Sequence, residues 1–153
     1  MAMPITVEVP DLVKLESDFK RAPSKVTEEI EKALTKSAIL IQRNAIKESP
    51  IDTGRLRSNI IYRVFFGTAV ISPNVDYAVY VHEGTRPHSM PFNAVEPWAR
   101  RKGIPAGAVW QSIRHKGTKG NPFMRRAAEQ SGDGVRKFFK DAADNVGKFL
   151  AKG

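Results

Sequence analysis

Residues 24–47 contain the pattern that most constrains how this chain folds. After the break at Ala22-Pro23-Ser24, apolar residues recur at the helical period, which predicts one long helix. At about 100° per residue, Ile39 and Ile46 fall outside its main apolar stripe, on the opposite side of the helix. A helix that is apolar on two faces contacts two other elements. Ile39 and Ile46 therefore either pack under another part of the chain or lie at a subunit interface.

A second long helix is predicted over about 122–150. Pro122 suits the first helical position, and from Val135 onward the apolar residues share one half of the helical wheel. Ser131-Gly132-Asp133-Gly134 is expected to kink or interrupt this helix. Between the two helices, residues 59–66 and 68–72 are β-branched and aromatic on either side of Gly67, which predicts a hairpin.

These elements predict an α+β fold. A short antiparallel sheet, with its hairpin at about 59–72, would be packed by the helix at about 24–47 and the helix at about 122–150. Residues 1–22 are expected to form an N-terminal arm with a strand at 4–9 and a short helix after Pro10-Asp11. Two further short helices are predicted at 94–102 and 106–115, with loops at 85–91 and 117–120.

Two turns carry specific structural predictions. Asp52 is expected to cap a short helical turn at 53–57, in which Gly54 shapes the backbone. Residues 77–83 fit either a strand, through their alternation, or a helix, and the following Gly84 suits a helix C-terminus. A short helix is preferred there.

Composition limits the classes of partner and chemistry. The absence of cysteine excludes disulfides and thiolate sites, and no apolar run is long enough to span a bilayer. Residues 1–10 lack the features of a secretion signal, so we expect a soluble protein made in the cytoplasm. The net charge is +9, and residues 97–128 contain bases but no acid. Such a segment either attracts phosphates or an acidic protein surface, or is simply a solvated face.

None of the short patterns that resemble catalytic or ligand-binding motifs is complete. Asp52-Thr53-Gly54 has the letters of an aspartic protease but the wrong flanking residues, and His82, Glu83 and His88 lack helical zinc-ligand spacing. The 117–120 segment lacks the context of a phosphate-binding loop. We therefore predict no catalytic, cofactor or metal site, and no enzyme activity.

An alternative reading is a small basic nucleic-acid-binding protein, toxin-like and directed at RNA. Trp98 and Trp110 bracket the basic segment as stacking residues would, and His115 lies between Arg114 and Lys116. Tryptophans beside amphipathic helices are, however, more often packing anchors.

Three blocks together resemble a known family. Pro50-x-Asp52-Thr53-Gly54-x-Leu56-Arg57, then Tyr77-Ala78-x-Tyr80-Val81-x-Glu83-Gly84-Thr85, then Asn121-Pro122-Phe123-Met124-x-x-Ala127 are similar to the small neck or tail-completion proteins of tailed bacteriophages. The resemblance covers about residues 24–150. Residues 92–116 resemble an insertion seen in some members, within a single domain at 23–153.

The resemblance implies a structural virion protein at the head–tail interface. It implies a homo-oligomeric ring through which DNA passes, with six copies favoured and twelve possible, contacting neck or connector proteins and tail-tube or terminator proteins. Such a ring needs one patch on each side of the subunit. The candidate interface residues are Ile39, Ile46, Tyr77, Tyr80, Glu83, Thr85 and Phe123. The candidate residues facing DNA or a partner are Arg100, Arg101, Lys102, Arg114, Lys116 and Lys119.

Overall fold

The computed structural model describes residues 5–6, 24–65 and 67–150, and it is a mixed helix-and-strand fold as predicted. The predicted strand at 4–9 is described only at Ile5–Thr6, and the predicted helix after Pro10 lies outside the described residues. The elements in chain order are β1 (Ile5–Thr6), α2 (Ser24–Glu48), α3 (Arg55–Ser58), β2 (Ile60–Phe65), β3 (Thr68–Pro73), α4 (Ala78–Glu83), β4 (Gly84–Thr85), α5 (Phe92–Lys102), α6 (Ala106–Lys116), β5 (Thr118–Lys119) and α7 (Phe123–Leu150).

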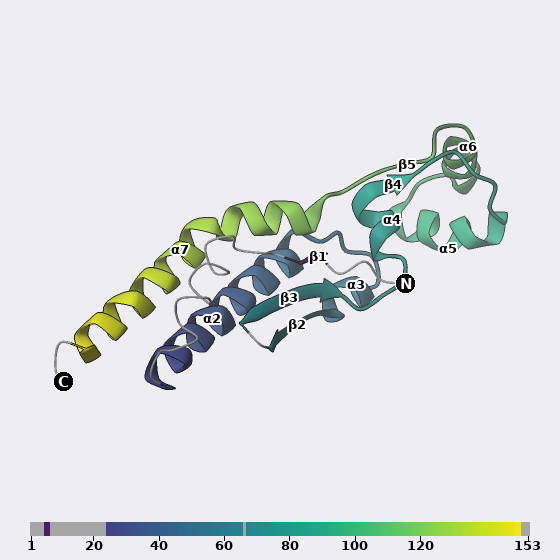
Figure 1. Ribbon diagram of the computed structural model, residues 1–153. Coiled ribbons are helices and arrows are strands. Elements are labelled where there is room, and N and C mark those ends of the chain that lie inside the picture. Colours follow the sequence, from purple (N-terminus) through teal and green to yellow (C-terminus); the bar gives the residue numbers. More distant parts are fainter. Residues whose placement is uncertain (1–4, 7–23, 66, 151–153) are drawn as a thin grey trace.

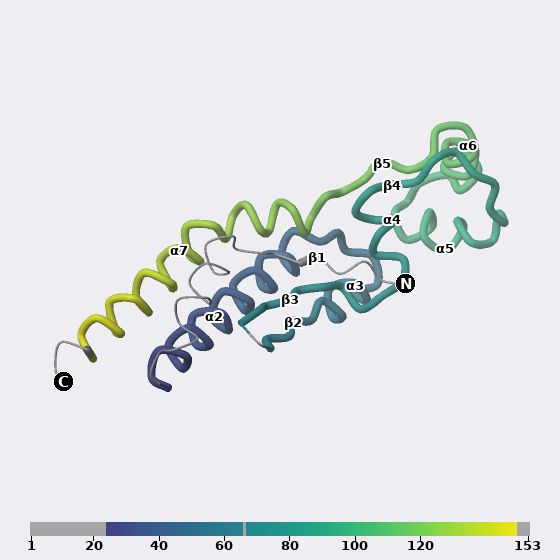
Figure 2. The backbone as a smooth tube through the Cα atoms, viewed as in Figure 1, coloured from purple at the N-terminus to yellow at the C-terminus, as the bar shows by residue number. Residues whose placement is uncertain are grey.

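Helix α2 is the central layer of the body. Figures 1 and 2 show α7 running along one side of α2 and the hairpin of β2 and β3 along the other. This placement explains why the helix is apolar on two faces. The core residues of α2 are Val26, Ala33, Leu34, Ala38, Ile41 and Ala45, and they are all buried.

The structure separates Ile39 from Ile46. The Ile46 side chain is partly buried and packs against the core, so it is covered by its own chain. The Ile39 side chain stays 45% exposed. Of the two alternatives left open by the sequence, packing within the subunit therefore holds for Ile46, and Ile39 is still a candidate for an interface.

The main sheet has the strand order β1-β3-β2, with both pairs antiparallel. The predicted hairpin is present, and Phe65 faces Thr68 across its turn. Strand β3 alternates, with Ala69, Ile71 and Pro73 buried against the helix layer. This alternation is the period-2 pattern of a sheet with one face on the core.

Helix α7 is continuous from Phe123 to Leu150, so of the two alternatives predicted at 131–134, a kink or an interruption, the interruption is wrong. Figure 1 shows instead that α7 changes direction between its green and its yellow parts. Ser131 Oγ donates to Ala127 O at 2.6 Å, a back-bond that favours bending. A Cβ at Gly134 would lie 2.5 Å from Leu40 Cδ2, so the glycine lets α7 approach α2 closely.

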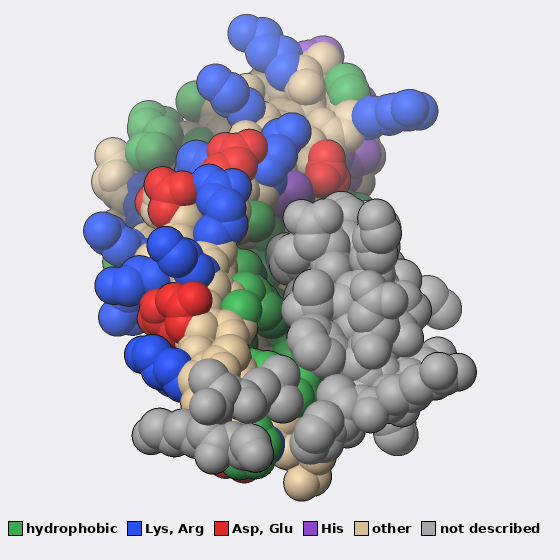
Figure 3. Space-filling view, turned by 60° about the vertical axis from the view of Figure 1, so that its left-hand side comes forward, with side chains coloured by type: hydrophobic (Ala, Val, Ile, Leu, Met, Phe, Trp, Pro, Cys, Tyr) green, Lys and Arg blue, Asp and Glu red, His purple; other side chains and the backbone are tan. Residues whose placement is uncertain are grey.

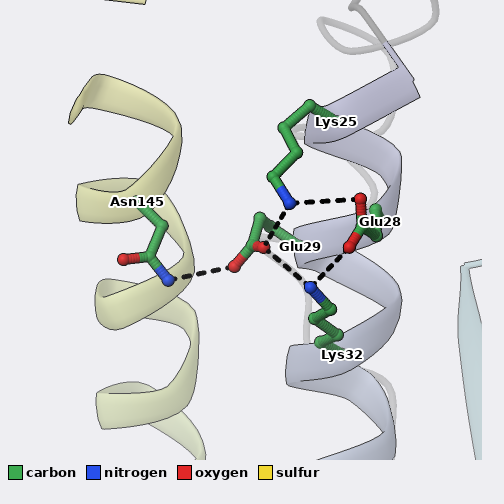
Figure 4. A network of polar contacts seen from close by, with 5 residues as sticks. All are labelled: Lys25, Glu28, Glu29, Lys32 and Asn145. Carbon is green, nitrogen blue, oxygen red and sulfur yellow. Dashed lines mark hydrogen bonds and ion pairs between the residues drawn. The ribbon is translucent and has the colours of Figure 1, made fainter. Parts of the chain in front are cut away.

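Polar side chains join α7 to both ends of α2. Glu48 accepts bonds from Arg126 Nε at 2.8 Å and Gln130 Nε2 at 3.0 Å, and the Arg126 bond lowers the pKa of Glu48. At the other end, Asn145 Nδ2 donates to Glu29 Oε2 at 3.0 Å (Figure 4). These contacts join the two antiparallel helices near both ends and so help to fix their register.

Glu29 makes this register sensitive to acid. Its side chain is buried, and the hydrogen bond from Asn145, assisted by Lys32 and Lys25, lowers its pKa to about 2. Because the folded pKa lies below the ordinary value of 4.5, stability from Glu29 is complete above about pH 4.5 and is lost between about 4.5 and 2.

We expect Glu29→Gln to flatten the fall in the free energy of unfolding across that pH range, since it removes the titrating group. Denaturant titrations at several pH values measure this slope. Glu31→Gln, on the exposed face of the same helix, is the control and should leave the slope as it is. Equal slopes for Glu29→Gln and the unchanged protein would contradict the assignment.

Candidate assembly surface

Helix α4 presents two tyrosines from a short, well-anchored turn. The preferred prediction of a helix at 77–83 is confirmed, and α4 ends at Gly84, whose N–H bonds to Tyr80 O. Ala78 is buried in the main core, which fixes one face of the helix. The side chains of Tyr77 and Tyr80 remain 39% and 61% exposed. Exposed tyrosines on a rigid helix are typical of protein contacts.

An apolar pocket of about 520 Å³ adjoins one face of α4. It lies between the loop before α3, α4 and α5. Three of its residues, Ile51, Tyr77 and Trp98, are large apolar side chains that remain exposed. The lining residues are Pro50, Ile51, Asp52, Thr53, Gly54, Arg55, Leu56, Tyr77, Val81, Trp98 and Lys102.

A second pocket of about 620 Å³ adjoins the neighbouring face of the same helix. Tyr80 and Met90 contribute its apolar surface, while Arg86 and His88 stand among its polar residues. Helix α4 therefore lies between two pockets, with Tyr77 at the first and Tyr80 at the second.

Asp52 joins the loop before α3 to α5, and its predicted role as a helix cap is wrong. Arg101 donates two bonds to the Asp52 carboxylate, from Nε at 2.8 Å and Nη2 at 2.6 Å. This pair lowers the pKa of Asp52. The N-cap of α3 is instead Gly54, at a φ of 83°, with no side-chain bond. A paired guanidinium competes better for a carboxylate than a backbone N–H does.

The loops predicted at 85–91 and 117–120 meet in a two-stranded ribbon. Gly84 pairs with Lys119 and Thr85 with Thr118, and the two threonine hydroxyls lie 2.9 Å apart. A Cβ on Gly117, at a φ of 74°, would lie only 1.9 Å from Thr85 O. The glycines at 84, 117 and 120 were the available sequence signal for this close approach.

Residues 86–117 project from the body between the two strands of this ribbon. They contain the whole of the predicted insertion at 92–116, and Figure 1 shows α5 and α6 at the end of the molecule away from the C-terminus. Val95 and Ala99 of α5 are buried, while α6 has no buried residue. Trp110 holds the unit together, because its Nε1 donates to Met90 O at 2.8 Å and Phe92 packs edge-on against its ring.

Phe123 is a core residue, so its prediction as an interface residue is wrong. Its side chain is fully buried and packs edge-on against His82, with ring centroids 5.6 Å apart. Asn121 N donates to Val81 O at 2.9 Å, which ties the start of α7 to α4. Pro122, predicted at the helix start, directly precedes α7. The structure thus brings the second and third sequence blocks together.

The other predicted interface residues have different surroundings. Glu83 is exposed and its Oε1 lies 2.6 Å from His82 Nδ1, while Thr85 lies half-buried in the ribbon. Among the described residues, His82 Nε2 is buried and has no hydrogen-bond partner.

The six predicted basic residues fall into two groups. Four are already engaged: Arg100 pairs with Glu96, Arg101 with Asp52, Lys102 donates to Ile51 O, and Arg114 lies over the Trp110 ring. Within the described part of the chain, Lys116 and Lys119 have no such partner. Arg86, which the sequence reasoning missed, shares this property.

Neither a metal site nor a membrane span is found in the described residues. No three of their His, Asp or Glu side chains gather to hold an ion, and none of their helices is long and apolar enough to cross a bilayer.

Comparison with known protein families gives a match in the N-terminal part of the chain. Residues 14–84 match the HK97-gp10-like family model, described as "Bacteriophage HK97-gp10, putative tail-component". The match contains the first sequence block and all of the second except Thr85, and it ends at Gly84, where the ribbon begins. It confirms the resemblance to a tailed-phage family and supports a structural phage protein located in the virion. No curated protein and no solved structure matches the chain.

Proposed function

We propose that this chain, whose residues 14–84 match a phage tail-component family model, completes the tail of a virion as a homo-oligomeric ring at the neck. The ring would join the tail to the head connector and let DNA pass through its centre. The observation that carries the proposal is the α4 surface, where exposed tyrosines lie beside two apolar pockets. Helix α4 lies within the matched residues, and the match ends at Gly84, directly after this helix.

A closed ring requires two different patches that fit each other. The α4 surface, with its apolar recess beside Ile51, Tyr77 and Trp98 and the exposed Tyr80, would supply one of these patches. Ile39, exposed on α2, supplies an apolar contact elsewhere on the subunit. Burial of such patches would drive assembly, and obligate interfaces typically bury about 2,000 Å² or more.

The geometry of tails favours six copies, with twelve as the alternative on the portal side. Neck or connector proteins and tail-tube or terminator proteins would be its neighbours in the virion. No enzymatic step belongs to this role.

We expect Tyr80→Asp to prevent assembly while the subunit still folds. Tyr80 is 61% exposed, so a charge there costs the subunit little but would be buried in an interface. Complementation of a phage lacking this gene measures the effect, and electron microscopy should show heads and tails that remain separate. Light scattering of the purified protein reports any ring formed before assembly.

Phe149→Asp is the matched control, because Phe149 is 48% exposed on α7, far from α4. It should support joined particles and place the protein at the neck in immunolabelling. If Tyr80→Asp complements as well as the control does, or if the protein is missing from the virions, the proposal fails.

A further inference from the structure

We propose that Arg86, Lys116 and Lys119 form a cationic cluster that binds the phosphates of double-stranded DNA without reading its sequence. The inference rests on the proposed function for the source of the DNA, which is the genome that passes the neck. The binding itself is a property of the folded subunit and can be measured without a ring.

The β4–β5 ribbon brings these three residues together from opposite ends of the insertion. Lys119 pairs with Gly84, and the next pair is Thr85 with Thr118, so Arg86 continues directly from one strand. A Cβ on Gly117 would lie 2.7 Å from the carbonyl carbon of Arg86, which brings Arg86 next to the residue that follows Lys116. The cluster is therefore held by backbone contacts rather than by mobile loops.

The charges of the cluster are not already neutralised. Arg100, Arg101, Lys102 and Arg114 of the same insertion each contact a carboxylate, a carbonyl or a ring. By contrast, Arg86, Lys116 and Lys119 are exposed and have no partner among the described residues. Figure 3 shows Lys and Arg side chains projecting from the end of the molecule where the histidines lie.

The surroundings of the cluster suit phosphate groups. The hydroxyls of Thr85 and Thr118 belong to the same ribbon, 2.9 Å from each other, and exposed His88 and His115 lie close to the cations in sequence. Hydroxyls and cations of this kind make most contacts to the DNA backbone. The one acid directly before the ribbon in sequence, Glu83, lies 2.6 Å from His82 Nδ1 through its Oε1.

An acidic protein surface is the less favoured partner. Protein interfaces are depleted in lysine and enriched in aromatic residues at their centres. The cluster contains two lysines and no aromatic residue, and α6, which leads into it, buries none of its residues. A DNA duplex also presents one negative charge about every 1.7 Å, which suits closely spaced cations.

Fluorescence anisotropy of a labelled DNA duplex, over about 50 to 200 mM salt, tests the proposal. The triple variant Arg86→Ala/Lys116→Ala/Lys119→Ala should bind at least about tenfold more weakly. Its plot of log affinity against log salt should be shallower by about 2–3. Two duplexes of different sequence should bind alike.

The triple variant Lys36→Ala/Arg43→Ala/Lys47→Ala is the control. It removes the same charge from exposed positions of α2 and should keep most of the affinity and slope. Equal losses in both triples would show attraction by net charge alone and overturn the proposal. So would absence of salt-dependent DNA binding, or cluster-dependent binding of polyglutamate in its place. Tyr80→Ala, which adds no charge beside Arg86 in the second pocket, should bind DNA normally while still impairing assembly, which separates this test from that of the ring.

Discussion

Phe123→Ala should lower the free energy of unfolding by about 3–5 kcal/mol, the range for emptying a well-packed aromatic site. Phe123 is fully buried where α7 begins, and it packs against His82 at the end of α4. The substitution removes the side chain that joins the C-terminal helix to the α4 surface. Equilibrium denaturation with urea, followed by circular dichroism, measures the change.

Phe149→Ala is the control for this prediction, since the same side chain is removed from a position that is 48% exposed. Its effect should stay within about 0.5 kcal/mol. A loss of similar size at both positions would mean that Phe123 does not belong to the core. Phe123→Leu should lie between them because it leaves a smaller cavity.

Gly117→Ala should open the β4–β5 ribbon. Its φ of 74° disfavours any residue with a Cβ, and that Cβ would lie 1.9 Å from Thr85 O and 2.9 Å from the Thr85 carbonyl carbon. Because the obstructing atoms belong to the backbone, no rotamer change can relieve the clash. Hydrogen exchange should show faster exchange of the Thr118 amide, and limited proteolysis should cut within 86–116.

Two other glycines separate the causes of this effect. Gly103→Ala combines a φ of 66° with open space, so it should show a backbone cost of only about 1–2 kcal/mol. Gly107→Ala lies in α6 with nothing within 4 Å and should be neutral or stabilising by up to about 1 kcal/mol. If Gly117→Ala behaved like Gly103→Ala, the close approach of the two strands would be refuted.

Both substitutions bear on the proposed functions. Phe123 packs against His82 of α4, the helix that carries Tyr80. Gly117 allows the close approach of the two strands that brings Arg86 next to the residue after Lys116. Gly117→Ala should therefore weaken DNA binding even though it changes no charge. Assembly should also suffer, because Tyr80 lines the second pocket together with the ribbon residues Gly84 and Thr85.

Periodicity was enough to predict the main elements. The two long helices and the hairpin came from repeats of 3.6 and 2 residues, which local burial imposes on a chain. The α4 helix was also predictable, because Gly84 ends it in a conformation that suits glycine. The apolar residues outside the main stripe of α2 predicted a second contact, in the same chain or in another subunit, and the structure supplies it within the chain for Ile46 but not for Ile39.

Residues whose roles depend on distant partners were not predictable. Asp52 has the sequence context of a cap, but Arg101, from a helix far along the chain, takes its carboxylate. Phe123 has the sequence context of a surface block, but the bond between Asn121 and Val81 turns it into the core. Neither partner can be inferred from spacing alone.

Local pattern therefore specified which segments are helix and strand, since each residue's preference is set by its near neighbours. Tertiary contacts specified which charges remain free, which apolar side chains stay exposed and where the insertion is anchored. Those properties arise when segments far apart in sequence compete for the same hydrogen bonds and the same buried space.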